Sequence, residues 1–297
     1  MIISLPFSID LTGKVAVVTG AGCVLCSMFS KALAQCGAKV AMLDLNEQAA
    51  RVFADEINAG GGIAKAYWCD VLNADSMKAA REQILNDLGE CDLLINGAGG
   101  NHPKATTTME YYEAGDFGAG GAEAIAAVGS GPKEVTFFDL ESEGIQFVFN
   151  LNFLGTLIPV QAFAKGMAGR PGSAIINISS MASFRALTKT PAYSAAKAAI
   201  SNLTQWLAVH FSRAGIRVNA IAPGFFLTKQ NEALLVNPDG TPTARSKKVL
   251  AQTPMGRYGK PEELLGALLL LADSGAASFI NGTVITVDGG YNAYSGV

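Results

Sequence analysis

The stretch Lys14-Val-Ala-Val-Val-Thr-Gly-Ala-Gly22 decides the fold that we expect for this chain. Its first six residues form a short apolar run rich in valine, which is typical of a buried strand. The glycines then mark a tight turn, and apolar residues recur at helical spacing from Val24 to Gly37. A strand, a glycine-rich turn and a helix in this order form the first part of a βαβ unit.

The same alternation continues along the chain. Further strands are expected at 39–43, 64–69, 92–95, 174–178, 217–221 and 283–287, and further helices at 46–59, 76–88, 140–166, 193–214 and 261–273. Strands and helices joined by short connections predict a doubly wound parallel sheet with helices on both faces, the Rossmann fold. Because the sequence contains no repeat or linker, residues 1–297 are expected to form a single dinucleotide-binding domain.

Two segments interrupt this rhythm. Residues at about 101–136 are rich in glycine, alanine and acidic side chains, and an irregular stretch of this length is usually a lid or a mobile loop. We therefore expect an insertion at the rim of the domain. Residues at about 228–254 are expected to form a second rim segment, on the side where the substrate binds.

The composition excludes several classes of protein. Of the 297 residues, 49% are hydrophobic and 16% are charged, and the net charge is −3. A balance without basic blocks predicts neither nucleic-acid binding nor a membrane-surface patch. The apolar runs 2–9 and 264–272 are too short to span a membrane, so we expect a cytoplasmic protein.

The cysteines and histidines argue against a metal site. An odd number of cysteines confined to the first third of the chain is not a disulfide framework. With only His102 and His210 as histidines, no metal is expected, and the cysteines are interpreted as small buried side chains in a reducing compartment. The five are Cys23, Cys26, Cys36, Cys69 and Cys91.

Polar or glycine-containing clusters follow four of the strands, at Gly20, Asp44, Asp70 and Asn96. Carboxyl ends of parallel strands share one edge of the sheet, where ligands bind in such folds. A carboxylate at Asp44 can accept hydrogen bonds from both adenosine ribose hydroxyls and would repel a 2′-phosphate. We therefore favour NAD over NADP, with a solvated loop acid as the alternative interpretation.

Tyr193 and Lys197 stand four residues apart, with Ser180 thirteen residues upstream. Positions i and i+4 share a helix face, and an ammonium near a phenol favours its ionised form. Such a phenol can donate and accept a proton near neutral pH, as carbonyl reduction by hydride transfer requires. The alternative is an exposed helix face on which the tyrosine packs against the lysine stem.

Together these pieces resemble the short-chain dehydrogenase/reductase family over nearly the whole chain. The matching positions are Thr19-Gly20 with its turn, Asp70-Val71, Asn96-Gly-Ala-Gly99, Asn152, Ser180, Tyr193 with Lys197, and Pro223-Gly224 with Thr228. One departure concerns the family turn Thr-Gly-x-x-x-Gly-x-Gly, whose last two glycines are Val24 and Cys26 here. We expect Gly22 to supply the backbone freedom lost at Val24, and Cys23, at a helix amino end, to be modestly sensitive to alkylation.

The resemblance implies a role for each matching residue. Tyr193 would be the general acid in reduction, Ser180 would bind the substrate carbonyl, and Asn152 would hold a water in a proton relay to Lys197. Lys197 would bind the nicotinamide ribose and lower the pKa of Tyr193. Cofactor contacts are expected from Gly20, Gly22, Cys23, Val24, Leu25, Asp44, Leu45, Asp70, Val71, Asn96, Gly97, Ala98, Tyr193, Lys197, Pro223, Gly224, Phe226 and Thr228.

Within the family, the chain is similar to the D-mannonate oxidoreductase (fructuronate reductase) branch. The similarity rests on residues 96–103, 152–155, 184–189, 222–228 and 293–297, and the departure at 24–26 is also similar to that branch. It implies reduction of D-fructuronate by NADH to D-mannonate. A sugar acid needs a cation for its carboxylate and polar groups for its hydroxyls, so the candidate substrate residues are Asn101, His102, Arg185, Lys189 and Asn231.

Arg185 or Lys189 is expected to bind the carboxylate, although both are otherwise ordinary solvated loop charges, and His102 before a proline could merely shape its turn. Two other functions remain open: the same fold acting on another keto-sugar or a polyol of the gluconate or sorbitol type, and a non-catalytic dinucleotide-binding protein. The presence of Ser180, Tyr193, Lys197 and Asn152 argues against the last. The resemblance also implies a homo-oligomer, a tetramer or a dimer.

Overall fold

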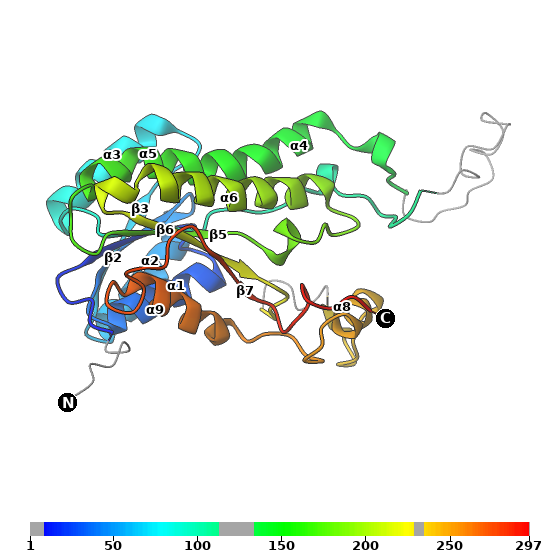
Figure 1. Ribbon diagram of the computed structural model, residues 1–297. Helices are drawn as coiled ribbons and strands as arrows, with labels where there is room; N and C mark the ends of the chain where they lie inside the picture. Colours follow the sequence, from blue (N-terminus) through cyan, green and yellow to red (C-terminus); the bar gives the residue numbers. More distant parts are fainter. Residues whose placement is uncertain (1–8, 113–133, 229–234, 297) are drawn as a thin grey trace, which may run out of the picture.

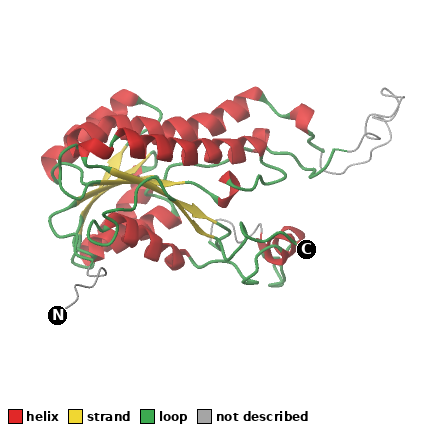
Figure 2. Cartoon of the chain, in the orientation of Figure 1, coloured by secondary structure: helices red, strands yellow, loops and turns green. Residues whose placement is uncertain are grey.

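A seven-stranded parallel sheet lies at the centre of the protein, in the order β3-β2-β1-β4-β5-β6-β7 (Figure 2). The computed structural model describes residues 9–112, 134–228 and 235–296. The strands are β1 (Val15–Thr19), β2 (Lys39–Asp44), β3 (Ile63–Trp68), β4 (Leu93–Asn96), β5 (Ala174–Ile178), β6 (Arg217–Pro223) and β7 (Val284–Val287). The strand order reverses between β1 and β4, so the predicted doubly wound sheet is confirmed, and its ligand crevice is expected at that point.

Helices cover both faces of the sheet (Figure 1). One layer contains α1 (Val24–Gln35), α2 (Glu47–Ala59) and α9 (Leu265–Ala272), and the other contains α3 (Ala74–Asp87), α5 (Gly155–Met167) and α6 (Pro191–His210). Successive side chains of a strand point to opposite faces, so Ala16 and Val18 pack beneath the first layer, and Val15 and Val17 beneath the second. A strand that lies between two apolar cores must therefore be apolar at every position.

The expected helix at 140–166 is present but interrupted. It consists of α4 (Ser142–Phe149), a π-helical turn (Asn150–Leu154) and α5. Among the described residues, the run Ser142–Met167 has the length and apolar composition of a membrane-crossing helix. This is weak evidence, because core helices of soluble proteins have the same properties, and α5 packs Val160, Phe163 and Met167 into the core.

Both rim segments are described in part. Residues 113–133 of the first segment lie outside the described residues. The described parts on either side are joined by two hydrogen bonds: Thr108 N donates to Val135 O at 2.9 Å, and Val135 N donates to Thr108 Oγ1 at 2.8 Å. Residues 229–234 of the second are also outside. Its described part contains a helix that the sequence did not indicate, α8 (Ala244–Ala251), capped by Thr243.

Candidate active site

A hollow of about 380 Å³ opens at the carboxyl ends of the strands, where β1, β4, β5 and β6 meet the start of α1 and of α6. Many of the predicted catalytic and cofactor residues line it, although they are up to two hundred positions apart in the sequence. They are Cys23, Val24, Leu25, Gly97, Ser180, Tyr193, Lys197, Pro223, Gly224, Phe226 and Thr228. Seven further residues line the same hollow but were not among the predicted cofactor contacts. They are Cys26, Phe29, Gly99, Gly100, Ile178, Ser179 and Phe225.

The turn after β1 is locked against the end of β4. Gly20 has a φ of +67°, and a Cβ there would lie 2.9 Å from the Cα and N of Ala98. Thr19 Oγ1 accepts hydrogen bonds from Gly97 N at 3.1 Å and Ala98 N at 3.2 Å. Only glycine combines this backbone conformation with this close approach. The expectation that Gly22 compensates for Val24 is wrong, because the left-handed residue is Gly20 and Val24 simply begins α1.

The loss of the third family glycine has a structural answer on the opposite strand. Cys26 is 2% exposed, and its sulfur occupies the space in front of Gly97, where any Cβ would overlap it. The glycine that permits close packing of helix and strand therefore lies at the end of β4. The start of α1, where Val24 and Leu25 line the hollow, then remains close to it, as a pyrophosphate requires.

Asp44 at the end of β2 is tied to the same turn. Its Oδ2 accepts from Gly22 N at 2.8 Å and its Oδ1 accepts from Asn46 N at 2.8 Å. These bonds hold the carboxylate beside the glycine turn, where the ribose-binding acid of a dinucleotide fold lies. Leu45 follows it and is exposed.

Eight predicted cofactor residues do not line the hollow: Gly20, Gly22, Asp44 and Leu45, described above, and Asp70, Val71, Asn96 and Ala98. Asp70 Oδ1 accepts from Leu72 N at 2.9 Å, and Val71 packs against Gly155. Asn96 is buried and donates its amide to Asn177 Oδ1 at 2.8 Å, which joins β4 to β5, while Ala98 contacts Gly20. Their contacts within the protein support the walls of the site.

Helix α6 carries Tyr193 and Lys197 on one face. Lys197 is 5% exposed, its Nζ donates to Ile178 O at 2.8 Å and lies 5.7 Å from the centroid of the Tyr193 ring. Ser180 is close enough to Tyr193 to lower its pKa. The three residues predicted to be proton donor, carbonyl-binding hydroxyl and ammonium thus line the same hollow, which argues against a chance tyrosine–lysine pair on an exposed helix.

The acid–base behaviour of this pair differs from the prediction. Burial raises the pKa of Tyr193, and the hydrogen bond from Ser180 lowers it by less. Burial also lowers the pKa of Lys197 to about 8. The net shift of the Tyr193 pKa is therefore upward, opposite to the expected lowering, and desolvation is its largest cause.

Asn152 lies in the π-helical turn and is fully buried. Its Nδ2 donates to Val148 O at 2.8 Å and Gly100 O at 2.7 Å, which fixes the side chain. A Cβ at Gly99 would lie 2.7 Å from Asn152 Oδ1 and 3.2 Å from Lys197 Nζ. Asn152 and Lys197 therefore approach the same side of Gly99, an arrangement compatible with the predicted proton relay. Single π-helical turns inside α-helices are frequent at functional sites.

The candidate substrate residues differ in their surroundings. Arg185 and Lys189 are exposed in the loop between β5 and α6. Lys189 lies near Glu110, although the pKa of Glu110 is lowered mainly by its hydrogen bond to Lys248. Burial raises the pKa of Tyr291, and the positive charge of Arg185 opposes that rise. Asn231 lies outside the described residues.

Asn101 and His102 are engaged in their own turn. Asn101 Nδ2 donates to Thr106 Oγ1 at 2.8 Å, and His102 Nδ1 accepts from Lys104 N at 3.2 Å. The His102 ring also packs 5.1 Å from that of Phe147. These contacts favour the alternative in which His102 shapes the turn before Pro103.

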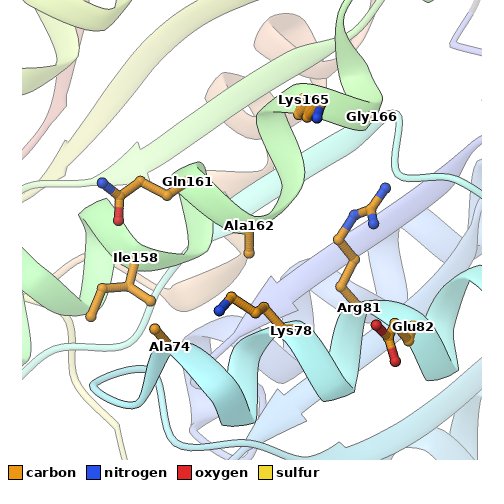
Figure 3. Close-up of a pocket in the computed structure, with 9 residues that line it drawn as sticks. All are labelled: Ala74, Lys78, Arg81, Glu82, Ile158, Gln161, Ala162, Lys165 and Gly166. Carbon is orange, nitrogen blue, oxygen red and sulfur yellow. The ribbon is translucent and has the colours of Figure 1, made fainter.

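A second hollow, of about 530 Å³, lies between α3 and α5 (Figure 3). Two of its three cations are already paired, since Arg81 bonds to Glu90 at 2.9 Å and Lys78 to Asp75 at 3.2 Å; the third is Lys165. The catalytic residues are absent from its lining. No group of three or more histidine, cysteine or acidic side chains that could hold a metal occurs in the part of the chain that the structure describes.

Comparison with known proteins agrees with this geometry. Residues 14–116 match the family model for short chain dehydrogenases, and residues 122–292 match a related model described as enoyl-(acyl carrier protein) reductase. An uncharacterized oxidoreductase from Haemophilus influenzae is 55% identical over 97% of this chain and 96% of its own length. The uncharacterized oxidoreductase UxuB from Bacillus subtilis is 49% identical over 99% of this chain and all of its own.

Solved structures share the fold. A protein assigned provisionally as a D-mannonate oxidoreductase from Haemophilus influenzae, with bound NAD, has a TM-score of 0.89 at 55% identity and covers 97% of this chain and 98% of its own. A gluconate 5-dehydrogenase from Burkholderia cenocepacia, with NADP and tartrate, has a TM-score of 0.78 at 28% identity over 97% of this chain and 98% of its own. The chain therefore belongs to the short-chain dehydrogenase/reductase family of nicotinamide-dinucleotide-dependent oxidoreductases.

Proposed function

We propose that this protein reduces the keto group of D-fructuronate with NADH to give D-mannonate, and catalyses the reverse oxidation. The observation that carries the proposal is the cluster of Ser180, Tyr193 and Lys197 at one end of the hollow, with Arg185 on the loop between Ser180 and Tyr193. The related structure described as a D-mannonate oxidoreductase, with NAD bound, supports the same substrate and cofactor.

The chain's own residues manage the proton and the orientation of the substrate. A bound nicotinamide dinucleotide supplies the hydride. Tyr193 donates a proton to the oxygen that becomes the alcohol, and the Ser180 hydroxyl stabilises the negative charge that develops on it. The raised pKa of Tyr193 keeps the phenol protonated at neutral pH, as a proton donor must be. Lys197 and Asn152 replace the proton through a bridging water.

The carboxylate of a sugar acid needs a cation, and Arg185 is our first choice. Its guanidinium is exposed beside Tyr291, whereas Lys189 lies within the field of Glu110. A guanidinium also binds a carboxylate through two parallel hydrogen bonds, which fixes the orientation of the substrate.

NAD is the cofactor that we propose in preference to NADP. The Asp44 carboxylate is held beside the turn by Gly22 N and Asn46 N, so it cannot swing away easily from a ribose. A 2′-phosphate would meet a fixed like charge, which costs binding energy. The NADP-bound gluconate 5-dehydrogenase shows that both cofactors occur within the fold, so the preference must be measured.

The decisive experiment is a substrate panel. Purified protein is assayed with NADH and with NADPH on D-fructuronate, and beside it on keto-sugars of the same length without a carboxylate. We expect D-fructuronate with NADH to have the highest kcat/KM. Equal turnover of the uncharged keto-sugars would favour the second candidate, a keto-sugar or polyol dehydrogenase, for which the likeness to gluconate 5-dehydrogenase speaks.

We also propose a cytoplasmic homo-oligomer, a dimer or tetramer. Helices α4 and α6 lie side by side on the outside of the protein (Figure 1) and expose large apolar side chains, among them Phe147, Trp206 and Val209, the last two 58% and 77% exposed. Exposed large apolar side chains on neighbouring helices are typical of association surfaces. Light scattering coupled to size-exclusion chromatography measures the molar mass in solution, and the mass of a monomer would contradict the proposed oligomer.

The five free cysteines support the proposed cytoplasmic location, because a reducing compartment keeps thiols reduced.

A further inference from the structure

We propose that Cys23 and Cys26 form a thiol–disulfide exchange site in the cofactor turn, which reacts with small disulfides when no dinucleotide is bound. The inference concerns a reaction separate from hydride transfer. It rests on dinucleotide binding at the start of α1 and does not depend on which sugar is the substrate.

The geometry is that of an attacking and a resolving thiol. Cys23 caps the amino end of α1, and its Sγ accepts from Cys26 N at 3.5 Å, so the two cysteines lie next to each other in the first turn. Both sulfurs lie at the wall of the same hollow. Cys23 is half-buried, whereas Cys26 is 2% exposed, so a reagent reaches the first sulfur and the second is sheltered behind it.

The two sulfurs differ in reactivity in the required direction. The hydrogen bond from Cys26 lowers the pKa of Cys23 to about 7, and burial and that same bond raise the pKa of Cys26. A cysteine at a helix amino end within a C-x-x-C sequence commonly has such a lowered pKa. At neutral pH a large share of Cys23 is therefore thiolate, the nucleophilic form.

The reaction balances without another oxidant. The Cys23 thiolate attacks one sulfur of a small disulfide, which releases one thiolate and leaves a mixed disulfide on Cys23. Cys26 then loses its proton to solvent and attacks Cys23 Sγ, which releases the second thiolate and closes the Cys23–Cys26 disulfide. The protein loses two electrons and the small disulfide gains them.

A bound dinucleotide opposes this reaction for two reasons. Its pyrophosphate occupies the start of α1, so it covers the approach to Cys23. Its negative charge also disfavours a thiolate at the same helix end, because two anions then compete for one positive end of the helix dipole. Reduced protein with dinucleotide and oxidised protein without it are the two favoured states.

The test uses the full-length protein and oxidised glutathione, with the free thiols counted after denaturation and the peptide containing residues 23–26 analysed by mass spectrometry. We expect the count to fall from five to three, with a disulfide between Cys23 and Cys26 and no glutathione retained. NADH at roughly ten times its Kd should slow the loss about tenfold.

Variants separate the steps. Cys26→Ser should trap glutathione on Cys23, Cys23→Ser should abolish the reaction, and Cys36→Ser, at the far end of α1, should behave as the wild type. Glutathione that stays on wild-type Cys23, reaction of Cys36 at the same rate, or a rate unaffected by NADH would overturn the proposal. Because the thiol count needs no sugar, a wrong substrate assignment would leave this result unchanged.

Discussion

The cofactor edge and the substrate rim meet at the same end of the sheet, but different forces hold them. The cofactor edge consists of residues 19–26, Asp44 and 97–100. It is fixed by the close approach of Gly20 to the Ala98 backbone and by hydrogen bonds from the backbone N–H groups of Gly22 and Gly97 to the side chains of Asp44 and Thr19. The substrate rim, the described parts of 101–136, 184–190 and 228–254, combines backbone hydrogen bonds, such as Thr107 N to Lys189 O at 3.0 Å, with ion pairs between side chains that are largely exposed. Its ion pairs join Lys104 to Glu141 and Lys248 to Glu110 at 2.6 and 2.7 Å.

This contrast indicates where the two parts of the function reside. Backbone contacts at positive φ or at van der Waals distance tolerate almost no substitution, so the chemistry of hydride and proton is fixed there. Exposed ion pairs contribute little to stability and can be exchanged at small cost. Substrate choice is therefore easily altered at the rim, and changes on the cofactor side should have larger effects than changes on the rim.

The largest effect is expected for Tyr193→Phe. The change keeps the ring and removes the proton donor, so turnover should fall about 10³-fold, while NADH binding, measured by fluorescence, stays unchanged. Tyr258→Phe is the matched control. Tyr258 lies just beyond the rim, and among the described contacts its hydroxyl bonds only to Ser246. Turnover by Tyr193→Phe above a tenth of the wild-type value would remove Tyr193 from the mechanism.

The buried charge of Lys197 should appear in stability as a function of pH. Burial lowers its pKa from 10.5 to about 8, so the unfolded chain binds more protons than the folded one between these values. The free energy of unfolding contributed by this group therefore rises with pH through that window. Lys197→Met should be more stable than wild type by about 3 kcal/mol at pH 7.

Denaturant unfolding of both proteins from pH 7 to 10 measures this difference, and comparison of the pair cancels the titration of cysteines and tyrosines. The difference should shrink as pH approaches the unperturbed value of lysine. A difference that stays constant with pH would mean that Lys197 is not desolvated in the folded protein.

Gly99→Ala tests the junction between the catalytic helix and the cofactor edge. The added Cβ would lie 2.7 Å from Asn152 Oδ1, which hydrogen bonds anchor, and 3.2 Å from Lys197 Nζ. Displacing either atom should lower kcat roughly 30-fold, the equivalent of about 2 kcal/mol. Gly100→Ala is the control, because its Cβ would meet only Leu151 at 3.6 Å. Equal losses in both variants would contradict a specific role for the Gly99 position.

The same contrast explains what the sequence could and could not predict. Strands such as β1 were predictable because a strand between two cores must be apolar throughout. That Tyr193 and Lys197 share a helix face was predictable from their spacing. The π-turn at Asn152 was not, since it depends on a partner at Gly100, fifty-two residues earlier. Nor was the packing of Cys26 on Gly97, or the pKa of Tyr193, because burial depends on tertiary structure. Helix α8 was missed because its segment has little apolar periodicity.

On the rim, Arg185→Ala should have the larger of two modest effects. Loss of a charge-assisted hydrogen bond should raise KM for D-fructuronate about tenfold and leave kcat nearly unchanged, whereas Lys189→Ala should change KM less than about threefold. An uncharged keto-sugar serves as the control substrate, and both variants should have the wild-type KM for it. If both variants leave KM for the sugar acid unchanged, the carboxylate binds elsewhere.

The smallest effect is expected for Lys248→Met. Lys248 is exposed and its pair with Glu110 joins the two rim segments, so the loss should lower the free energy of unfolding by less than about 1 kcal/mol. Thermal unfolding at low and at high salt measures it, and added salt should erase the difference because it screens exposed charges. The matched change on the core side is Arg170→Met, which breaks a pair with the buried Asp92 at 2.9 Å and should cost clearly more, since a buried carboxylate loses a partner. Equal costs for the two changes would mean that the rim is as firmly coupled to the fold as the sheet itself.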